Sequence, residues 1–373
     1  MIILEFIYKA GRIMKKMKVL VCWATFGKFY MKAIEDSEEL VLAGILSNGS
    51  KNSIDIAKNL KVPLYTNINS IRGDMFDLAC VVIRSTIVGG EGSKLVDSLL
   101  NKKISVIQEQ PVHKNEIISN YKTAENNQVF YGLNSFYPYF DTAIRFIKIK
   151  KELLKMTKIR AIESTCSIQT LYPFLCVLSS IFEDVVPFEL DKKMLNFSEY
   201  KVITGKIKGI PFIINVQNQI VPRDPDNYYN WLYKMSIITE AGNLVLTNFN
   251  GAIIWEPKIY HGKDDSGFIM TKDGKNVWSK IPVMQILSDG SQKNAYNLFY
   301  EHYPNCIKNY IDRFYNNIKE KNIDMSDINR QLNICDLWTE ISHMIGAVEI
   351  INPYKIKTLI YQQDRGVFES VKE

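Results

Sequence analysis

Between Lys18 and Tyr137 the hydrophobic positions fall into short apolar runs that alternate with longer amphipathic stretches. The apolar runs predict strands over 19–23, 40–46, 62–65, 78–83, 104–108 and 129–133, and the stretches between them predict helices over 28–36, 53–60, 92–101 and 115–126. This alternation indicates a mostly parallel, doubly wound α/β sheet. The first strand, helix and second strand have the size of a dinucleotide-binding βαβ unit.

After Tyr137 the pattern changes to α+β. A helix over 140–157 and an apolar segment over 171–182 precede five alternating runs, which predict antiparallel strands over 202–206, 211–219, 233–239, 243–248 and 252–255. Turns are expected at 208–209 and 240–243, and helices come after them over 293–301, 306–321 and 327–346. We therefore expect an N-terminal extension (1–16), a Rossmann domain (17–136) and an α+β domain with an open antiparallel sheet (137–373).

Composition narrows the class of protein. The 373 residues are 46% hydrophobic and 23% charged, as in an ordinary globular protein. The net charge of +6 comes from 46 basic and 40 acidic residues spread along the chain, so we expect no nucleic-acid surface, although an anionic cofactor or acidic partner would suit it. Residues 1–16 contain an apolar run that is too short to cross a bilayer. They are either an amphipathic extension or the result of a wrongly chosen start codon, in which case Met14 or Met17 is the true start.

Cysteines and histidines give no metal pattern. The six cysteines are far apart without a CxxC pair, and we interpret them as reduced core thiols of a cytoplasmic protein. The four histidines lack metal-ligand spacing, so no metal site is expected.

The first two strand ends suggest a dinucleotide site. The turn after the first strand reads Cys22-Trp23-Ala24-Thr25-Phe26-Gly27 and keeps only the last glycine of a G-x-G-x-x-G fingerprint. From this string alone, phosphate binding by residues 24–27 and an ordinary turn are equally good interpretations. After the second strand, residues 47–53 contain hydroxyls, amides and Lys51 but no carboxylate. That composition suits a 2′-phosphate bound by Lys51 and the Ser50 hydroxyl, whereas the alternative is a solvated loop with a helix cap at Asn52 or Ser53.

The next three strand ends should face the same crevice. Residues 84–92 are glycine-rich and form either a phosphate- or substrate-binding surface or a flexible crossover turn. Glu109, Gln110, Pro111 and His113 follow the fifth strand, and 134–139 follow the sixth. A tyrosine there, such as Tyr137, can act as a general acid, although most tyrosines in a chain with 20 of them are packing residues.

These segments resemble the thiazolinyl imine reductases of siderophore biosynthesis, a branch of the Gfo/Idh/MocA oxidoreductases. The resemblance rests on Phe26-Gly27 with Tyr30, and on the segments 49–50, 63–66, 82–90, 106–113, 134–138 and 224–226. It is dense in the first domain and thin in the second. It implies hydride transfer from NADPH to the carbon of a thiazoline C=N bond, on an intermediate held as a thioester by a carrier domain of a non-ribosomal peptide synthetase. The wider superfamily also implies a homodimer formed through the open sheet.

The expected site draws on the carboxyl ends of five of the six predicted strands. We expect the cofactor to be bound by Ala24, Thr25, Phe26, Gly27, Ser47, Gly49, Ser50, Lys51, Arg84, Ser85, Thr86, Glu109, Gln110 and Pro111. We expect the substrate to be bound by Gly89, Gly90, Asn134 and Tyr137, and catalysis to involve Tyr137, Gln110 and His113.

The source of the proton distinguishes this chain from its relatives. Reduction of C=N needs an acid, and the family offers a histidine in a Glu-His-Pro motif and a tyrosine in a Phe-Tyr-Pro motif. Gln110 stands at the first position and has no usable proton, so the role falls on Tyr137, on a water held by Gln110, or on His113, and we favour Tyr137. Sugar dehydrogenases of the superfamily have a lysine at this position, and its absence argues against sugar oxidation.

Trp23 is a second departure, because the family tends to have glycine there. Since a bulky residue does not readily take a positive φ, we expect either a different path for the first turn or an indole that covers the nucleotide.

Two alternative functions stay open. One is an oxidoreductase of the same superfamily that acts on another imine or carbonyl. The other is a non-catalytic NADP-binding protein, for which Gln110 and Trp23 are the only support.

Overall fold

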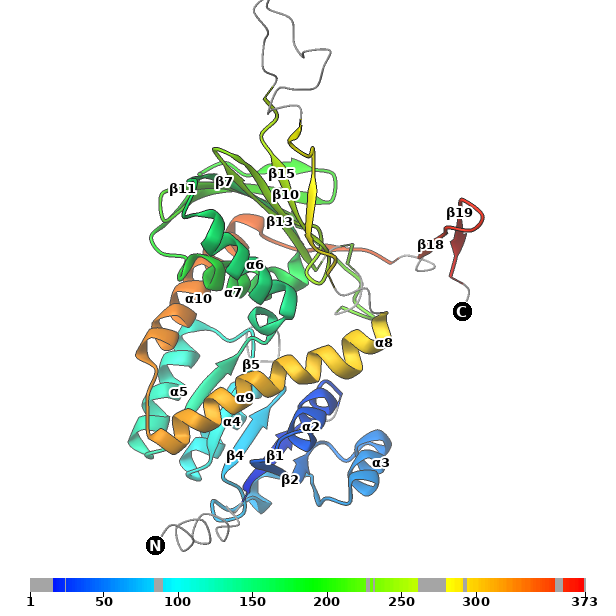
Figure 1. Ribbon diagram of the computed structural model, residues 1–373. Coiled ribbons are helices and arrows are strands. Elements are labelled where there is room, and N and C mark those ends of the chain that lie inside the picture. Colours follow the sequence, from blue (N-terminus) through cyan, green and yellow to red (C-terminus); the bar gives the residue numbers. More distant parts are fainter. Residues whose placement is uncertain are drawn as a thin grey trace, which may run out of the picture.

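The computed structural model describes residues 16–23, 25–83, 90–225, 229–230, 232–260, 280–290, 294–352 and 358–371. Two sheets lie one above the other in Figure 1, and the lower one is six-stranded and parallel. Its order is β3-β2-β1-β4-β5-β6, that of a Rossmann fold. Its strands are β1 (Met17–Cys22), β2 (Leu40–Leu46), β3 (Leu64–Tyr65), β4 (Leu78–Val81), β5 (Ser105–Glu109) and β6 (Tyr131–Asn134).

The lower sheet confirms the predicted alternation. All four residues of β4 and of β6 are buried, which explains why these strands appear in the sequence as continuous apolar runs. The connecting elements are α2 (Gly27–Glu35), α3 (Lys51–Leu60), η1 (Ile68–Ser70), α4 (Gly92–Asn101) and α5 (Lys114–Asn126). Because β1 lies between β2 and β4, the chain reverses its winding direction there and leaves a crevice at the carboxyl ends of the strands.

The upper sheet has nine strands and is mixed. Its main order is β16-β15-β14-β13-β7-β11-β10-β8, with β9 paired to β10. The strands are β7 (Ile159–Ser167), β8 (Phe188–Leu190), β9 (Leu195–Phe197), β10 (Tyr200–Ile207), β11 (Ile210–Gln217), β13 (Tyr233–Thr239), β14 (Gly242–Leu246), β15 (Ile253–Pro257) and β16 (Gln285–Ser288). The five predicted strands are all present, and the expected turn at Lys208-Gly209 joins β10 to β11 with both residues at positive φ.

The central strand β7 was not predicted. It carries buried Ser164, Thr165 and Ser167, so its inward positions do not stand out as apolar. It pairs in parallel with β11 and antiparallel with β13, so the expectation of a purely antiparallel sheet is corrected at this one pair.

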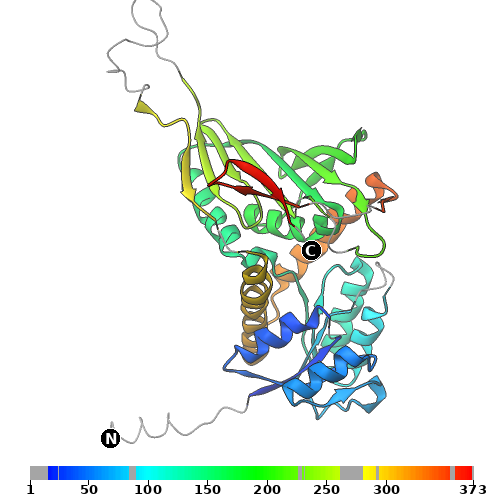
Figure 2. The same ribbon diagram turned by 90° about the vertical axis from the view of Figure 1, so that its right-hand side faces the viewer.

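Two helices cover one face of the upper sheet. They are α6 (Asp141–Leu153) and α7 (Leu171–Phe182), which lie on the side facing the lower sheet (Figure 1). The residues of β13 alternate between buried and half-buried, as expected for one face packed on these helices. In the part of the chain that the structure describes, no helix covers the other face, which is in front in Figure 2. We call it the open face.

The last long helices return to the lower sheet. The segment comprises α8 (Ala295–Asn297), the π-helical turn η6 (Leu298–His302), α9 (Tyr303–Glu320) and α10 (Met325–Ile345). Helix α9 packs on α2 and against β6, while α10 packs on α5 and α7. A Cβ atom on Gly132 of β6 would lie 2.6 Å from the Tyr310 hydroxyl of α9, so glycine permits this close approach.

Seven short strands were not predicted. Three of them, β8, β9 and β16, belong to the upper sheet. The other four are β12 (Gln219–Ile220), which pairs with β17 (Glu349–Ile350), and β18 (Leu359–Gln362), which pairs with β19 (Val367–Ser370). Two-residue strands carry no usable period, and β18 and β19 expose their apolar side chains instead of alternating.

Candidate active site

Polar residues from two neighbouring strands meet at the carboxyl edge of the lower sheet. Glu109 ends β5 and is in register with Asn134, which ends β6. The backbone N–H of Gln110 donates to the Asn134 carbonyl at 3.3 Å. The Gln110–Pro111 peptide is cis. The structure therefore brings together the two clusters that the sequence placed on adjacent strand ends.

Tyr30 of α2 links these two strand ends. Its hydroxyl donates a short hydrogen bond to Oε2 of Glu109 and accepts one from Nδ2 of Asn134 at 2.5 Å. The Tyr30 side chain is fully buried. In the sequence, Tyr30 stood out only as part of the family resemblance. The available signal was a hydroxyl on the buried face of the first helix, three residues after Gly27.

Burial changes the acidity of Glu109. Removal from water raises the pKa of its carboxyl to about 8, although the hydrogen bond from Tyr30 partly opposes this. The pKa of Tyr30 is raised well above 10, first by burial and then by the neighbouring Glu109. Near neutral pH, Glu109 is thus mostly a neutral acid held by a neutral phenol.

Two acceptor atoms at this edge have no hydrogen-bond partner among the described residues. They are Oε1 of Gln110 and Oδ1 of Asn134, both buried. An unpaired buried oxygen is unfavourable unless a ligand or a water supplies a donor. These two oxygens can therefore accept hydrogen bonds from N–H or O–H groups of a bound molecule or of a water.

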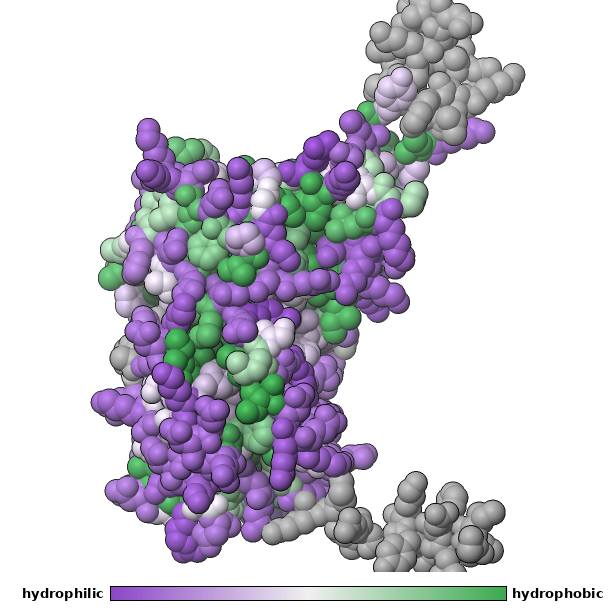
Figure 3. Space-filling model, turned by 90° about the vertical axis from the view of Figure 1, so that its left-hand side faces the viewer, coloured by the Kyte–Doolittle hydropathy of each residue, from purple (hydrophilic) through white to green (hydrophobic). Residues whose placement is uncertain are grey.

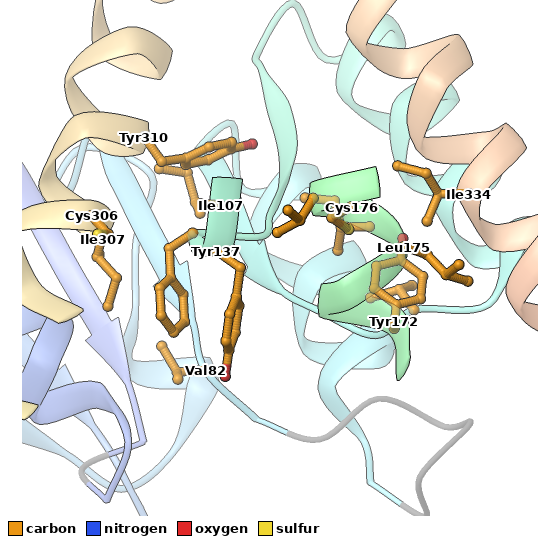
Figure 4. Close-up of a cluster of buried hydrophobic side chains, with 14 of the residues drawn as sticks. Val82, Ile107, Tyr137, Tyr172, Leu175, Cys176, Cys306, Ile307, Tyr310 and Ile334 are labelled. Carbon is orange, nitrogen blue, oxygen red and sulfur yellow. The ribbon is translucent and has the colours of Figure 1, made fainter. Parts of the chain in front are cut away.

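Tyr137 lies in an aromatic cluster beside this edge. It belongs to the turn η3 (Tyr137–Tyr139), is only 8% exposed and stacks on Phe136 at 4.6 Å between ring centroids. Figure 4 shows it in the same buried cluster as Ile107 of β5 and Val82, which follows β4. Burial raises the pKa of Tyr137 well above 10, and the hydroxyl of Tyr303 raises it further. Tyr137 is therefore a protonated donor over the physiological pH range.

His113 has a structural role. It is exposed and precedes α5 as its N-cap, with Nδ1 accepting from the Asn115 backbone N–H at 3.3 Å. This contact uses one ring nitrogen, which weakens the expectation that His113 supplies the proton.

The first turn takes a glycine-like path despite its tryptophan. Trp23 has φ +82°, and its backbone N–H donates to the Leu46 carbonyl at 2.7 Å. The first alternative, a different path for this turn, is wrong, because the backbone takes a positive φ and this hydrogen bond helps to hold it there; an indole that covers the nucleotide stays a prediction. The side chain is 37% exposed.

Gly27 allows α2 to lie close to β1. A Cβ atom at this position would lie 3.0 Å from Cγ1 of Val21, which explains why the last glycine of the fingerprint is kept. The helix begins without a side-chain cap at Phe26, so its first N–H groups remain available to an anion. Thr25 beside it is exposed.

The end of β2 has the geometry of a second anion site. Gly49 takes φ +77°, and Ser50 caps α3, its Oγ accepting from the Ser53 N–H at 3.3 Å. The cap is thus Ser50, not Asn52 or Ser53. Lys51 begins the helix and is exposed, with no ion pair to another described residue, while Ser47 is buried. A cation and a helix N-terminus at one point favour a phosphate.

Several predicted site residues lie outside the described part of the chain. Ala24 and residues 84–89, which include Arg84, Ser85, Thr86 and Gly89, belong to this group, as do residues 1–15 of the expected extension. Gly90 is described and half-buried, next to the start of α4.

Other classes of site find no support in the described residues. No group of three or more His, Cys, Asp or Glu side chains could hold a metal there. All six cysteines are buried and unpaired, as predicted. Within the same ranges, no helix has both the length and the apolar character needed to cross a membrane.

A Rossmann sheet with a polar carboxyl edge is typical of nicotinamide-dinucleotide-dependent oxidoreductases. Residues 17–135 match the model of the oxidoreductase family GFO_IDH_MocA, with its NAD-binding Rossmann fold. Residues 157–256 match the C-terminal model of the Irp3-like thiazolinyl imine reductases. The two matches support the sequence resemblance, the first part to the Gfo/Idh/MocA oxidoreductases and the second part to the Irp3-like thiazolinyl imine reductases.

Solved structures share the two-part fold at low identity. An oxidoreductase from Agrobacterium radiobacter in complex with NAD+, L-tartaric acid and magnesium has a TM-score of 0.62 and 13% identity, over 87% of this chain and 95% of that one. UDP-N-acetylglucosamine 3-dehydrogenase from Acidithiobacillus ferrooxidans has a TM-score of 0.62 and 10% identity, over 89% of this chain and 98% of that one. Apo scyllo-inositol dehydrogenase from Lactobacillus casei has a TM-score of 0.58 and 15% identity, over 88% of this chain and 96% of that one. No curated protein sequence matches the chain significantly.

Proposed function

We propose that this protein reduces the C=N bond of a thiazoline to a thiazolidine with NADPH, on a siderophore-type intermediate carried as a thioester by a carrier domain of a non-ribosomal peptide synthetase. The match of the second part to the Irp3-like reductases supports the substrate class. The observation that carries the proposal is the buried, protonated Tyr137 beside an edge where Gln110 stands in place of the lysine used in sugar oxidation.

The residues present fit NADPH. The uncapped start of α2 at Gly27 suits the pyrophosphate, and Ser50 with Lys51 at the start of α3 suits a 2′-phosphate. Residues 47–53 hold no carboxylate that would select unphosphorylated ribose. The unpaired oxygens of Gln110 and Asn134 can accept hydrogen bonds from an amide of the cofactor or from the substrate. When bound, NADPH supplies the hydride.

Tyr137 supplies the proton in this proposal. Addition of hydride to the carbon places an electron pair on nitrogen, which takes the phenolic proton, so that C=N becomes CH–NH. The phenolate left on Tyr137 lies next to the Tyr303 hydroxyl, which can donate a hydrogen bond to it until a proton returns from solvent. Because burial keeps both phenols protonated, the site acts as an acid and not as a base.

The test is NADPH consumption with a thiazoline thioester mimic. We expect Tyr137→Phe to lose at least about 100-fold in kcat, the usual contribution of a general acid, and to bind NADPH normally. Tyr139→Phe is the matched control, because Tyr139 lies on the same turn and its hydroxyl accepts from Arg313 at 3.1 Å. Full activity of Tyr137→Phe would remove Tyr137 from the mechanism.

The same assay separates the alternative functions. Turnover of sugars or keto acids, with none of thiazolines, would assign the protein to another substrate class. NADPH binding without turnover of any carrier-bound imine would point to a non-catalytic role. A higher kcat/KM for the carrier-loaded substrate than for the free mimic would support the carrier domain as partner.

A further inference from the structure

The side chain of Asn134 is hydrogen-bonded on one side of its amide and unpartnered on the other. Its Nδ2 donates to the Tyr30 hydroxyl at 2.5 Å, whereas its Oδ1 has no hydrogen-bond partner among the described residues. The residue is fully buried, and its backbone carbonyl accepts from the Gln110 N–H. The freedom that remains is a rotation of the amide, which would exchange the positions of Oδ1 and Nδ2.

Tyr30 decides which of these two atoms faces away from it. A hydroxyl group carries one proton, and Tyr30 donates that proton to Oε2 of Glu109. Toward Asn134 it can therefore only accept, so the amide has to turn Nδ2 to Tyr30 and Oδ1 away from it. A neutral Glu109 carboxyl still offers an acceptor oxygen, so this direction of the hydrogen bonds does not require an ionised Glu109.

Other parts of the chain cover the strand that carries Asn134. Tyr310 of α9 lies against Gly132 on one face of β6, and α5 packs on this strand as well. Gln331 of α10 covers its free edge, where Nε2 donates to the Leu133 carbonyl at 3.2 Å. The outer surface of this flank, where α5 and α10 lie, is mostly polar with scattered apolar residues (Figure 3). Among the described residues, the carboxyl edge of the sheet is therefore the side from which a ligand can reach Oδ1.

Strand order indicates which part of a dinucleotide comes to this position. Strand β2 lies on one side of β1, whereas β4, β5 and β6 lie on the other. The starts of α2 and α3 suit the pyrophosphate and the 2′-phosphate, so the nicotinamide half extends over β4 to β6. The carboxamide is the N–H donor of that half. An unpaired buried oxygen at the end of β6 is the matching acceptor.

We propose that Tyr30 is a positioning residue, which turns the Asn134 amide so that Oδ1 accepts a hydrogen bond from the carboxamide N–H2 group of the bound nicotinamide. This assigns Asn134 to the cofactor, whereas the sequence suggested the substrate. The proposal rests on the nicotinamide cofactor of the proposed function. It does not depend on the thiazoline substrate or on the choice between NADPH and NADH.

The test compares two dinucleotides that differ only in this group. In the 3-acetylpyridine analogue of NADP+, a methyl group replaces the N–H2 of the carboxamide and the carbonyl is kept. Calorimetric titration gives both dissociation constants without turnover. The parent should bind NADP+ about tenfold more tightly than the analogue, because the analogue leaves Oδ1 unpaired. In Tyr30→Phe the amide is free to turn, so the two dissociation constants should become equal.

Two further variants separate this role from a general loss of structure. Tyr131→Phe is the matched control, because it removes another buried hydroxyl of the same sheet, one that donates to Oε1 of Gln108 at 2.7 Å. This variant should keep the ratio of the parent. Asn134→Leu removes the acceptor itself while Tyr30 stays in place, and it should lose the preference for NADP+ just as Tyr30→Phe does.

The ratio of dissociation constants also decides against the proposal if it behaves otherwise. Equal binding of NADP+ and the analogue by the parent would overturn it, as would a parent-like ratio in both Tyr30→Phe and Asn134→Leu. A parent-like ratio together with a higher KM for the thiazoline mimic would assign Oδ1 to the substrate instead. If the chain binds NAD+ more tightly, the same comparison applies to NAD+ and its acetylpyridine analogue. Failure of the proposed reaction is distinguishable, because it would abolish thiazoline turnover and leave the ratios as expected.

Discussion

The acidity of Glu109 makes stability depend on pH in an unusual direction. Its pKa rises from the ordinary 4.5 to about 8 in the folded protein, so between these values the folded state binds more protons than the unfolded state. The contribution to stability is fully present below pH 4.5 and is lost as the pH rises through 8. For most buried carboxylates with lowered pKa the direction is the reverse.

The size of the effect can be worked out from the two pKa values. Integration of proton binding for this single group gives a loss of about 3 kcal/mol in the free energy of unfolding between pH 5.5 and pH 8. Glu109→Gln replaces the carboxyl with a neutral amide whose oxygen can still accept from Tyr30. We therefore expect this variant to lose the decline and to be more stable than the parent at pH 8.

Urea unfolding at pH 5.5, 7 and 8 measures this directly. The quantity of interest is the difference between variant and parent in their change with pH, which cancels contributions from all other groups. Glu125→Gln, an exposed position on α5, should reproduce the parent's dependence. Parallel curves for Glu109→Gln and the parent would show that Glu109 is ionised in the folded state and would refute the reasoning.

Two further predictions concern the cofactor end of the site. Because Trp23 holds φ +82°, a conformation that costs a residue with a Cβ atom about 1–2 kcal/mol, Trp23→Gly should raise the free energy of unfolding by about 1 kcal/mol in urea titrations; a loss of stability would instead mean that indole packing outweighs the strain. Lys51→Ala should weaken NADPH binding about tenfold or more and leave NADH binding unchanged, measured by fluorescence titration of both cofactors; equal weakening of the two would disprove a 2′-phosphate contact at Lys51.

The sequence predicted the lower sheet well because its strands are buried on both faces. Strand β2 and helix α4 have the predicted bounds, and the convergence of the Glu109 and Asn134 ends follows from strand order alone. Strand β7 escaped prediction because serine and threonine occupy buried positions, which the sheet satisfies through neighbouring backbone groups such as the Ile213 carbonyl.

Contacts between distant segments set the limit of sequence reasoning at the site. Tyr30 reaches Glu109 only because α2 follows β1 and begins at the carboxyl edge of the sheet, and Tyr303 reaches Tyr137 only because α9 returns to the lower sheet. Neither pairing has a local pattern in the chain. The sequence could predict on which helix or strand end each of these side chains lies, whereas its contact with a side chain from a distant segment could be found only in the structure.

The return of α9 also fixes the order in which the molecule can be completed. Phe29 of α2 stacks on Phe299, and Gly132 of β6 is covered by Tyr310, so this side of the lower sheet is closed by residues that come after the whole upper sheet in the chain. During synthesis from the N-terminus, that apolar surface stays open to water until α9 emerges. The lower sheet is therefore synthesised first, but this apolar side of it is among the last surfaces to be buried.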